Sequence, residues 1–151
     1  MSRMSLDVGA LLLEMVPFAR TLGIAWDSVG DGRAICRLPD REELHNHVAG
    51  PHAGALFTLA ETASGAAMLS VFGDQLERAV PLATSARVEY RKVAKGEVRA
   101  EARVLRAREG VVGALDAGER PEFDVAVDVR NGDGEVVCVL NVTWTLRPNR
   151  G

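Results

Sequence analysis

Aromatic residues are scarce in this sequence, which contains four Phe, two Trp and one Tyr among 151 residues. An excess of positive charge is also lacking, because 18 basic residues are set against 21 acidic ones. Proteins that bind nucleic acid or anionic lipid need clustered positive charge. We therefore expect neither a nucleic-acid partner nor a membrane partner.

What remains is typical of a globular protein. The chain is 47% hydrophobic and 26% charged, which excludes disordered and disulfide-scaffold classes. Its length predicts a single domain over residues 1–151. With few aromatic residues and 15 Gly, the core must be built from Val, Leu and Ala in elements that pack closely.

Cysteine is also rare, since Cys36 and Cys138 are the two that the chain contains. They show neither a C-x-x-C motif nor a metal-binding spacing, and each lies in an apolar run. We expect two buried free thiols in a reducing cytosol, and hence a cytoplasmic protein. The N-terminus lacks the long hydrophobic region of a signal peptide and predicts a short amphipathic helix, capped by Ser5 and ending near Phe18.

The segment Ala53–Phe72 contains a single charged residue, Glu61. Its length alone would allow a membrane span, but eight of its twenty residues are Ala or Gly, and Thr and Ser lower its hydrophobicity further. A helix that is apolar on all sides in a soluble chain is a central, buried helix. That is the structure predicted for this segment.

Strands are predicted on both sides of this helix. Ile24–Val29 and Arg33–Leu38 form a hairpin, and after Pro81 apolar residues alternate with polar ones, as in half-buried strands. Glu109–Glu122 is expected to be either a lid or a loose hairpin loop. The inward residues expected in the first later strand are Leu82, Thr84, Ala86, Val88 and Tyr90. Those expected in the following strands are Val98, Ala100, Ala102 and Val104, then Phe123, Val125, Val127 and Val129, then Val136, Cys138, Leu140, Val142, Trp144 and Leu146.

This order of elements predicts an α+β domain with antiparallel strands. Asn131-Gly132-Asp133-Gly134 is a strong hairpin turn between the last two strands. A flat sheet cannot cover a helix that is apolar on all sides, so the sheet must curl around it. The side of the helix that stays uncovered is expected to pack against another subunit.

Glu61 is the residue that points most directly to chemistry. A lone carboxylate on an apolar helix loses several kcal/mol of solvation unless it is paired or protonated. Desolvation raises the pKa of such a group toward neutrality, as a general acid or base requires. The alternative is that Glu61 reaches the helix surface or caps a neighbouring backbone group.

All three histidines, His45, His47 and His52, fall just before this helix, with Asn46 among them. His52-Ala53-Gly54 marks the helix start, where free backbone N–H groups and the positive end of the dipole can polarise a carbonyl oxygen. Neither cysteine is near this region in the sequence. The pattern is that of acyl-transfer chemistry without an obvious Ser or Cys nucleophile.

The run from Asn46 through His52-Ala53-Gly54 to Glu61 and Gly65 resembles the signature of hotdog-fold acyl-CoA thioesterases of the phenylacetate-pathway type. The likeness extends from about Gly23 to Leu146. It implies a curled antiparallel sheet around one long helix. It also implies a homodimer or a dimer of dimers (a homotetramer) with active sites at subunit interfaces, an acyl-CoA substrate, and no metal or redox cofactor.

The resemblance also implies roles for individual residues. Glu61 would be the general base or the nucleophile, and the backbone N–H of Ala53 or Gly54 would bind the thioester oxygen beside His52. Asn46 would orient the attacking water across the interface.

The chain departs from the family pattern at three places. Ala53 stands where most members have glycine, and Glu61 where many have aspartate. The strand hydroxyl that some members use is not clearly matched, since Ala83 occupies its place and Thr84 and Ser85 flank it.

Three other functions remain open. A β-hydroxyacyl dehydratase would use His47 and Glu61 as a proton-transfer pair. A non-catalytic acyl-CoA-binding module would need neither. A metal enzyme would use the three histidines with Glu61 as ligands.

The sequence offers two groups of cations that could hold the phosphates of CoA, although the favoured explanation for each is an ordinary outward face of a strand. The first group is Arg87, Arg91, Lys92 and Lys95, and the second is Arg99, Arg103, Arg106 and Arg108.

Overall fold

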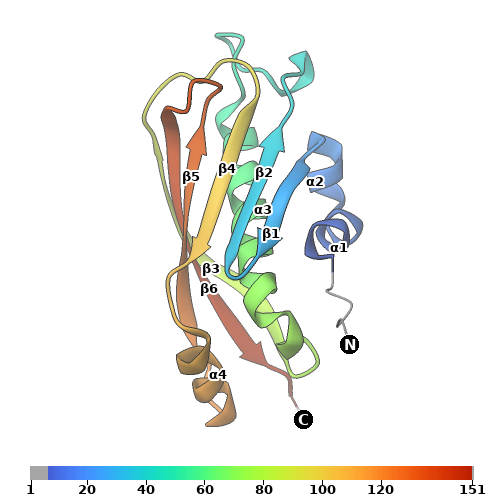
Figure 1. The fold of residues 1–151 in the computed structure, drawn as a ribbon, viewed down its shortest axis with the longest axis vertical. Helices are drawn as coiled ribbons and strands as arrows, with labels where there is room; N and C mark the ends of the chain where they lie inside the picture. Colours follow the sequence, from blue (N-terminus) through green and yellow to red (C-terminus); the bar gives the residue numbers. More distant parts are fainter. Residues whose placement is uncertain (1–6, 151) are drawn as a thin grey trace.

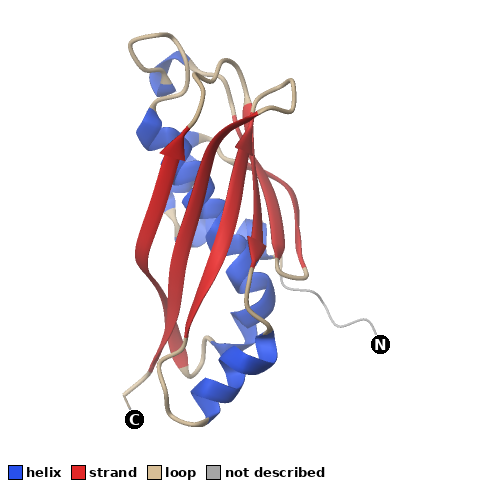
Figure 2. Cartoon of the chain, turned by 90° about the vertical axis from the view of Figure 1, so that its left-hand side faces the viewer, coloured by secondary structure: helices blue, strands red, loops and turns tan. Residues whose placement is uncertain are grey.

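The computed structural model describes residues 7–150. Six strands form one antiparallel sheet in the order β1-β2-β4-β5-β6-β3, and the long helix α3 lies along its concave face (Figures 1 and 2). The curled sheet around one central helix confirms the predicted α+β fold. The elements are α1 (Val8–Met15), α2 (Pro17–Leu22), β1 (Ala25–Gly30), β2 (Arg33–Leu38), η1 (Glu42–Leu44), α3 (Ala53–Phe72), η2 (Gly73–Gln75), β3 (Ala79–Tyr90), β4 (Val98–Val104), α4 (Arg108–Asp116), β5 (Glu122–Arg130) and β6 (Val136–Pro148).

Helix α3 begins and ends at the predicted residues, Ala53 and Phe72. This helix is long and apolar enough to cross a membrane. Most of it is buried inside the domain, as in the core helix of a soluble protein. Its Ala and Gly residues allow this close packing, because small side chains let the strands approach the helix backbone. Phe72 closes the far end, with its ring 4.7 Å from that of Phe123.

Strands β4, β5 and β6 follow the predicted alternation. Their inward apolar residues are buried, and only Val104 and Val136, at strand ends, are partly exposed. Cys36 and Cys138 are buried and unbridged, as expected. The Asn131–Gly134 turn is confirmed, because the Asn131 side chain accepts hydrogen bonds from the backbone amides of Asp133 and Glu135.

The prediction of one N-terminal helix ending near Phe18 is wrong, because two short helices meet at Val16. Pro17 lacks an N–H group and its ring would clash within a continuous helix, so it begins α2 instead. Asp7 caps α1 by accepting a hydrogen bond from the Ala10 amide. The predicted cap, Ser5, lies outside the described residues.

The inward face predicted for the strand from Leu82 to Lys92 is also wrong. Thr84, Ala86 and Tyr90 are exposed, and Leu82 and Val88 are only partly buried. Strand β3 is an edge strand that pairs with β6 alone, and a bulge between Ala83 and Ser85 interrupts its register. Helix α3 lies over the other strands, so alternation in β3 does not bury either face.

The segment expected to be a lid or a loose loop contains the helix α4 instead. Its own residues Val111 and Leu115 are buried, so α4 is part of the packed domain. Arg108 fixes its start, since both guanidinium nitrogens bond the carboxylate of Asp74 at 2.7–2.9 Å. The pairing raises the pKa of Arg108 and lowers that of Asp74.

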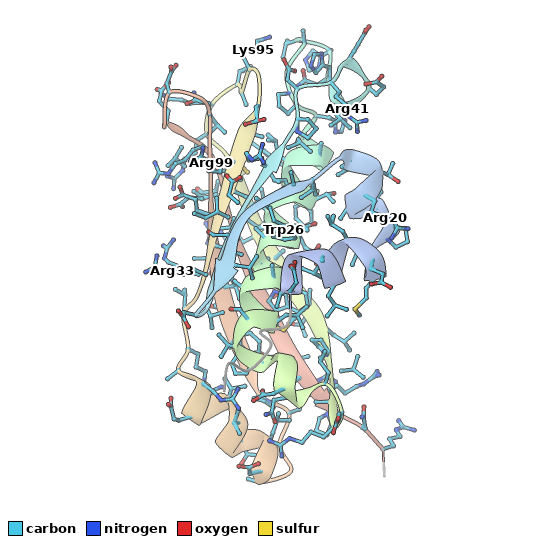
Figure 3. The ribbon with its side chains drawn as sticks, turned by 45° about the vertical axis from the view of Figure 1, so that its right-hand side comes forward. Arg20, Trp26, Arg33, Arg41, Lys95 and Arg99 are labelled. Atoms are coloured by element: carbon cyan, nitrogen blue, oxygen red, sulfur yellow. The ribbon has the colours of Figure 1, made fainter. Side chains whose placement is uncertain are left out.

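A buried chain of hydrogen bonds ties α3 to the sheet. Trp144 Nε1 donates to Ser64 Oγ over 3.1 Å, and Ser64 Oγ donates to the Glu61 carbonyl over 2.7 Å. The second tryptophan, Trp26, packs against α1 (Figure 3), and its buried Nε1 has no hydrogen-bond partner within residues 7–150. The two indoles therefore differ in whether their N–H is used.

We predict that Trp144→Phe lowers the free energy of unfolding by about 1–3 kcal/mol more than Trp26→Phe does. Trp144→Phe leaves the buried Ser64 oxygen without its donor, whereas Trp26→Phe removes an N–H that bonds nothing described. Urea unfolding of both variants measures the difference. Equal losses would show that the Trp144 hydrogen bond contributes nothing beyond the volume of the ring.

Candidate active site

The loop before α3 is organised by Asn46. Its Oδ1 accepts hydrogen bonds from the amides of Val48 (3.0 Å) and Gly50 (3.1 Å), and its Nδ2 donates a longer bond of 3.4 Å to the Pro51 carbonyl. Lys95, labelled in Figure 3, donates to the Val48 carbonyl from the β3–β4 connection. The Asn46 side chain is thus largely engaged within its own loop.

Gly50 is the one residue of this loop that cannot carry a side chain. A Cβ at this position would lie 2.2 Å from the Ala94 carbonyl oxygen, well inside van der Waals contact. The loop therefore packs backbone against backbone on the β3–β4 connection. This contact fixes the approach of the chain to the first turn of α3.

The three histidines are separated by the fold. His45 Nε2 lies 2.6 Å from the Asp40 carboxylate, and His47 is exposed on the loop. His52 is the N-cap of α3, where its Nδ1 accepts a 2.8 Å hydrogen bond from the Gly54 amide. Within residues 7–150 no group of three His, Cys, Asp or Glu side chains is placed to hold a metal ion.

The first turn of α3 presents free backbone donors. The Gly54 amide bonds His52 Nδ1, and the Leu56 amide bonds the His52 carbonyl. The amides of Ala53 and Ala55 have no acceptor among the described residues, as is general for the first turn of a helix. Of the two amides proposed from the sequence, Ala53 is the one available to a ligand.

Tyr90 joins this turn to the end of β3. Its hydroxyl donates a 3.2 Å hydrogen bond to the Ala53 carbonyl, while 49% of the residue remains exposed. Partial burial raises the pKa of Tyr90, so the hydroxyl remains a donor at neutral pH. Sequence reasoning missed Tyr90 as part of the site, although it is the only tyrosine of the chain.

Two cavities flank Tyr90 at the start of α3. One has a volume of about 560 Å³ and is bordered by the aromatic rings of Phe18 and Phe57 together with His52 and Gly54. The other, of about 310 Å³, is bordered by Asn46, Ala53 and Tyr90. Both volumes lie in the range of ligand pockets. Sequence reasoning also missed Phe18 and Phe57, whose spacing carries no signal beyond hydrophobicity.

Glu61 lies farther along the open side of α3. Gly54, Thr58 and Glu61 follow one another at helical spacing, and Thr58 and Glu61 are only partly buried, while the helix beyond residue 61 is almost entirely buried. The Glu61 carboxylate has no hydrogen-bond or ion-pair partner within residues 7–150. Desolvation raises the pKa of Glu61, with no nearby cation to lower it.

Neither cavity is bordered by Glu61. Ala53 and Glu61 are eight residues apart, which is about 12 Å along the helix axis. The fold therefore brings His52, Ala53, Gly54 and Asn46 to one end of α3. It leaves Glu61 two turns away from them in the same chain.

The two cysteines and Thr84 are poor candidates for a nucleophile. Burial raises the pKa of the Cys138 thiol to about 11 and that of Cys36 still further, so neither forms a reactive thiolate. Thr84 uses its hydroxyl to donate to the Thr143 carbonyl within the sheet. Ala83 and Ser85 flank the β3 bulge and are exposed.

Comparison with known proteins gives a family and several solved relatives. The family described as "Domain of unknown function (DUF4442)" matches residues 7–146. A Pseudomonas aeruginosa protein of unknown function, described as a probable thioesterase, is 28% identical over 99% of each chain, with a TM-score of 0.84. A conserved protein of the same organism is 32% identical over 85% of this chain and 92% of its own, with a TM-score of 0.70.

A more distant match extends the comparison of folds. The Escherichia coli PaaI protein of the phenylacetic acid degradation operon is 18% identical over 95% of this chain and 92% of its own, with a TM-score of 0.71. At this identity the likeness shows the fold alone. No curated protein matches the chain. The protein thus has the hotdog fold shared with PaaI-type thioesterases, as its sequence predicted, and it belongs to the family described as domain of unknown function DUF4442.

Proposed function

We propose that this protein hydrolyses acyl-CoA thioesters to the free acid and CoA. The observation that carries the proposal is Glu61, a desolvated carboxylate without a partner among the described residues, on the same helix as a free N-terminal amide. Structural relatives described as thioesterases support the same reaction class.

The proposed reaction needs two kinds of group. The Ala53 amide donates to the thioester oxygen and stabilises the negative charge that develops there. As general base, Glu61 takes a proton from the water that attacks the carbonyl carbon, the C–S bond breaks, and the proton passes to the departing CoA thiolate. As nucleophile, Glu61 attacks the carbonyl carbon itself and displaces CoA, and water then hydrolyses the resulting anhydride to the free acid. His52 keeps the Gly54 amide occupied and the first turn fixed, and Asn46 would orient the attacking water across the interface with its remaining amide hydrogen.

The spacing along α3 supports a site built from two subunits. A single carbonyl cannot contact both the Ala53 amide and the Glu61 carboxylate when about 12 Å of helix separates them. A second copy related by a two-fold axis would run its α3 in the opposite direction and bring its Glu61 toward Ala53. Edge strand β3 pairs with β6 on one side only, so its other side is open to the β3 of a second copy.

We accordingly propose a homodimer, or a dimer of dimers, with interfacial sites. The buried free cysteines support a reducing cytoplasm as its location. No metal or redox cofactor is part of this proposal.

The first prediction concerns Glu61. Glu61→Gln should lower kcat/KM for acyl-CoA hydrolysis by about 10²–10⁴-fold, because amide cannot act as base or nucleophile. Glu109→Gln, an exposed glutamate at the start of α4, should have no effect. A free-thiol assay over acyl-CoAs of different chain length and aromaticity measures both. In wild type, activity should fall with decreasing pH through a pKa above the usual glutamate value.

Stability measurements separate loss of chemistry from loss of folding. The raised pKa of Glu61 means that ionisation costs the folded state free energy, a cost that is absent below the unfolded-state pKa and complete above the folded-state pKa. Glu61→Gln should therefore be more stable than wild type at neutral pH, and the difference should shrink on acidification. Unchanged hydrolysis in Glu61→Gln would reject the proposed role. Acyl-CoA binding without thiol release by wild type would instead favour a binding module.

The second prediction isolates the Ala53 amide. Ala53 is the first residue of α3, where proline is favoured, and the extended conformation of His52 suits a residue before proline. Ala53→Pro should fold normally yet lose about 10²–10³-fold in kcat/KM, as expected when one oxyanion donor is removed. Ala53→Gly, which keeps the N–H, should retain activity. If Ala53→Pro hydrolyses as fast as Ala53→Gly, the oxygen is bound elsewhere.

The third prediction tests the two-subunit site. Ala53→Pro and Glu61→Gln chains, each inactive alone, should regain activity when co-expressed as heterodimers. One interface then combines an intact Ala53 amide with an intact Glu61 from the other chain. Thiol release by purified heterodimers, carrying different affinity tags, measures the recovery. Absence of recovery in a confirmed heterodimer would place both groups in one chain.

A further inference from the structure

The cations singled out in the sequence are nearly all engaged. Arg91 pairs with Glu89, Lys92 with Glu135 and Arg99 with Asp27. Arg106 donates to the Glu122 and Gly110 carbonyls, and Arg103 pairs with Asp128. With Lys95 and Arg108 bonded as described above, only Arg87 of the two groups has no partner within residues 7–150. Most of these cations therefore already have a partner within residues 7–150 and are less available to a phosphate.

Free guanidinium groups gather elsewhere, at the end of β6. A cavity of about 500 Å³ is lined by Arg120, Arg147, Pro148, Asn149 and Arg150. Among the described residues the side chains of Arg147 and Arg150 make no ion pair or hydrogen bond, and that of Arg120 makes one hydrogen bond. Three positive charges thus converge in a chain whose net charge is −3.

Hydrogen bonds hold two of the residues that line this cavity, Arg120 and Asn149. Arg120 Nε donates over 3.3 Å to the hydroxyl of Thr145, which is fully buried and itself donates to the Pro121 carbonyl over 2.7 Å. Asn149 bonds the Arg78 and Glu77 carbonyls through its amide and side chain. The terminal nitrogens of Arg120 have no partner within residues 7–150 and can bind a ligand.

The surrounding carboxylates do not neutralise the cluster. Asp116 pairs with Arg78 at 2.8 Å. Glu119 and Glu122 lie near Arg120 in sequence and are exposed, and neither forms an ion pair with the three arginines. Planar guanidinium groups bind phosphate oxygens in pairs, and several of them around one cavity favour a ligand with more than one phosphate oxygen to offer.

We propose that the Arg120–Arg147–Arg150 cavity binds the phosphate groups of a small molecule of the diphosphate or nucleotide-phosphate type. The site lies at the end of the molecule opposite the first turn of α3 (Figure 1). Strand β3 has twelve residues, so Ala79, which pairs with Pro148, is about 36 Å from Tyr90. The cavity is therefore distinct from the cavities at the start of α3 in the same chain.

Two sources of phosphate satisfy this chemistry. A free phosphate ligand would bind the cavity independently of any reaction. Alternatively, and resting on the proposed function, antiparallel pairing of two β3 strands would set the Pro148 end of one copy beside the Tyr90 end of the other. The arginines would then hold the phosphates of CoA bound at the partner's α3.

Binding of pyrophosphate and of adenosine 3′,5′-bisphosphate, measured by calorimetry at low salt, tests the proposal. Arg147→Ala and Arg120→Ala should each weaken binding by about tenfold or more, since each removes a charge-assisted hydrogen bond. Arg33→Ala is the matched control, because Arg33 is an exposed arginine on β2 without an ion pair in the described chain (Figure 3). No binding to wild type, or equal weakening by Arg33→Ala, would overturn the proposal.

Hydrolysis kinetics identify the source. If the ligand is CoA, Arg147→Ala should raise KM for acyl-CoA. The value of kcat, and the KM for the matching acyl-pantetheine, should stay unchanged. If the ligand is a free phosphate compound, pyrophosphate binding should weaken in Arg147→Ala with both kinetic constants unchanged. Glu61→Gln should bind pyrophosphate like wild type. If the protein binds pyrophosphate but hydrolyses no thioester, the proposed phosphate site stands and only the proposed reaction is rejected.

Discussion

The close fit of α3 inside the curled sheet is the constraint on which the rest of the molecule depends. Ala and Gly along the helix let five of the six strands, all but β3, approach it, and a chain with few aromatic residues suits that closeness. The Trp144–Ser64–Glu61 hydrogen bonds fix its rotation. Since rotation decides which side of α3 stays open, the same packing decides which residues lie outside the core.

This packing leaves the Glu61 carboxylate poorly solvated. A carboxylate that is partly removed from water and lacks a cation is destabilising unless another feature compensates for it. The helix contributes nothing that neutralises it, since Glu61 is its single charged residue and lies two turns from the positive end of the dipole. Stability and reactivity are therefore opposed at this position, as is common where function requires a poorly solvated group.

The sequence predicted most of the fold because burial leaves a periodic pattern. The bounds of α3 and the inward residues of β4, β5 and β6 follow from that pattern alone. It failed in β3, where Thr84 and Ala86 alternate with polar residues as in a covered strand although both are exposed. The grouping of Asn46, His52 and Ala53 at the start of α3 followed from chain adjacency. The convergence of Arg120 with Arg147 did not, since it depends on the pairing of β5 with β6.

The choice of cation has a chemical consequence. Lys92 and Lys95 are the two lysines of the chain, and the other sixteen of its 18 basic residues are arginine. Thioesters acylate free amines, whereas arginine stays protonated and does not react. Both lysine amines are held, one by the Glu135 carboxylate and the other by the Val48 carbonyl. These two lysines are therefore the only side-chain amines of the chain that a thioester could acylate.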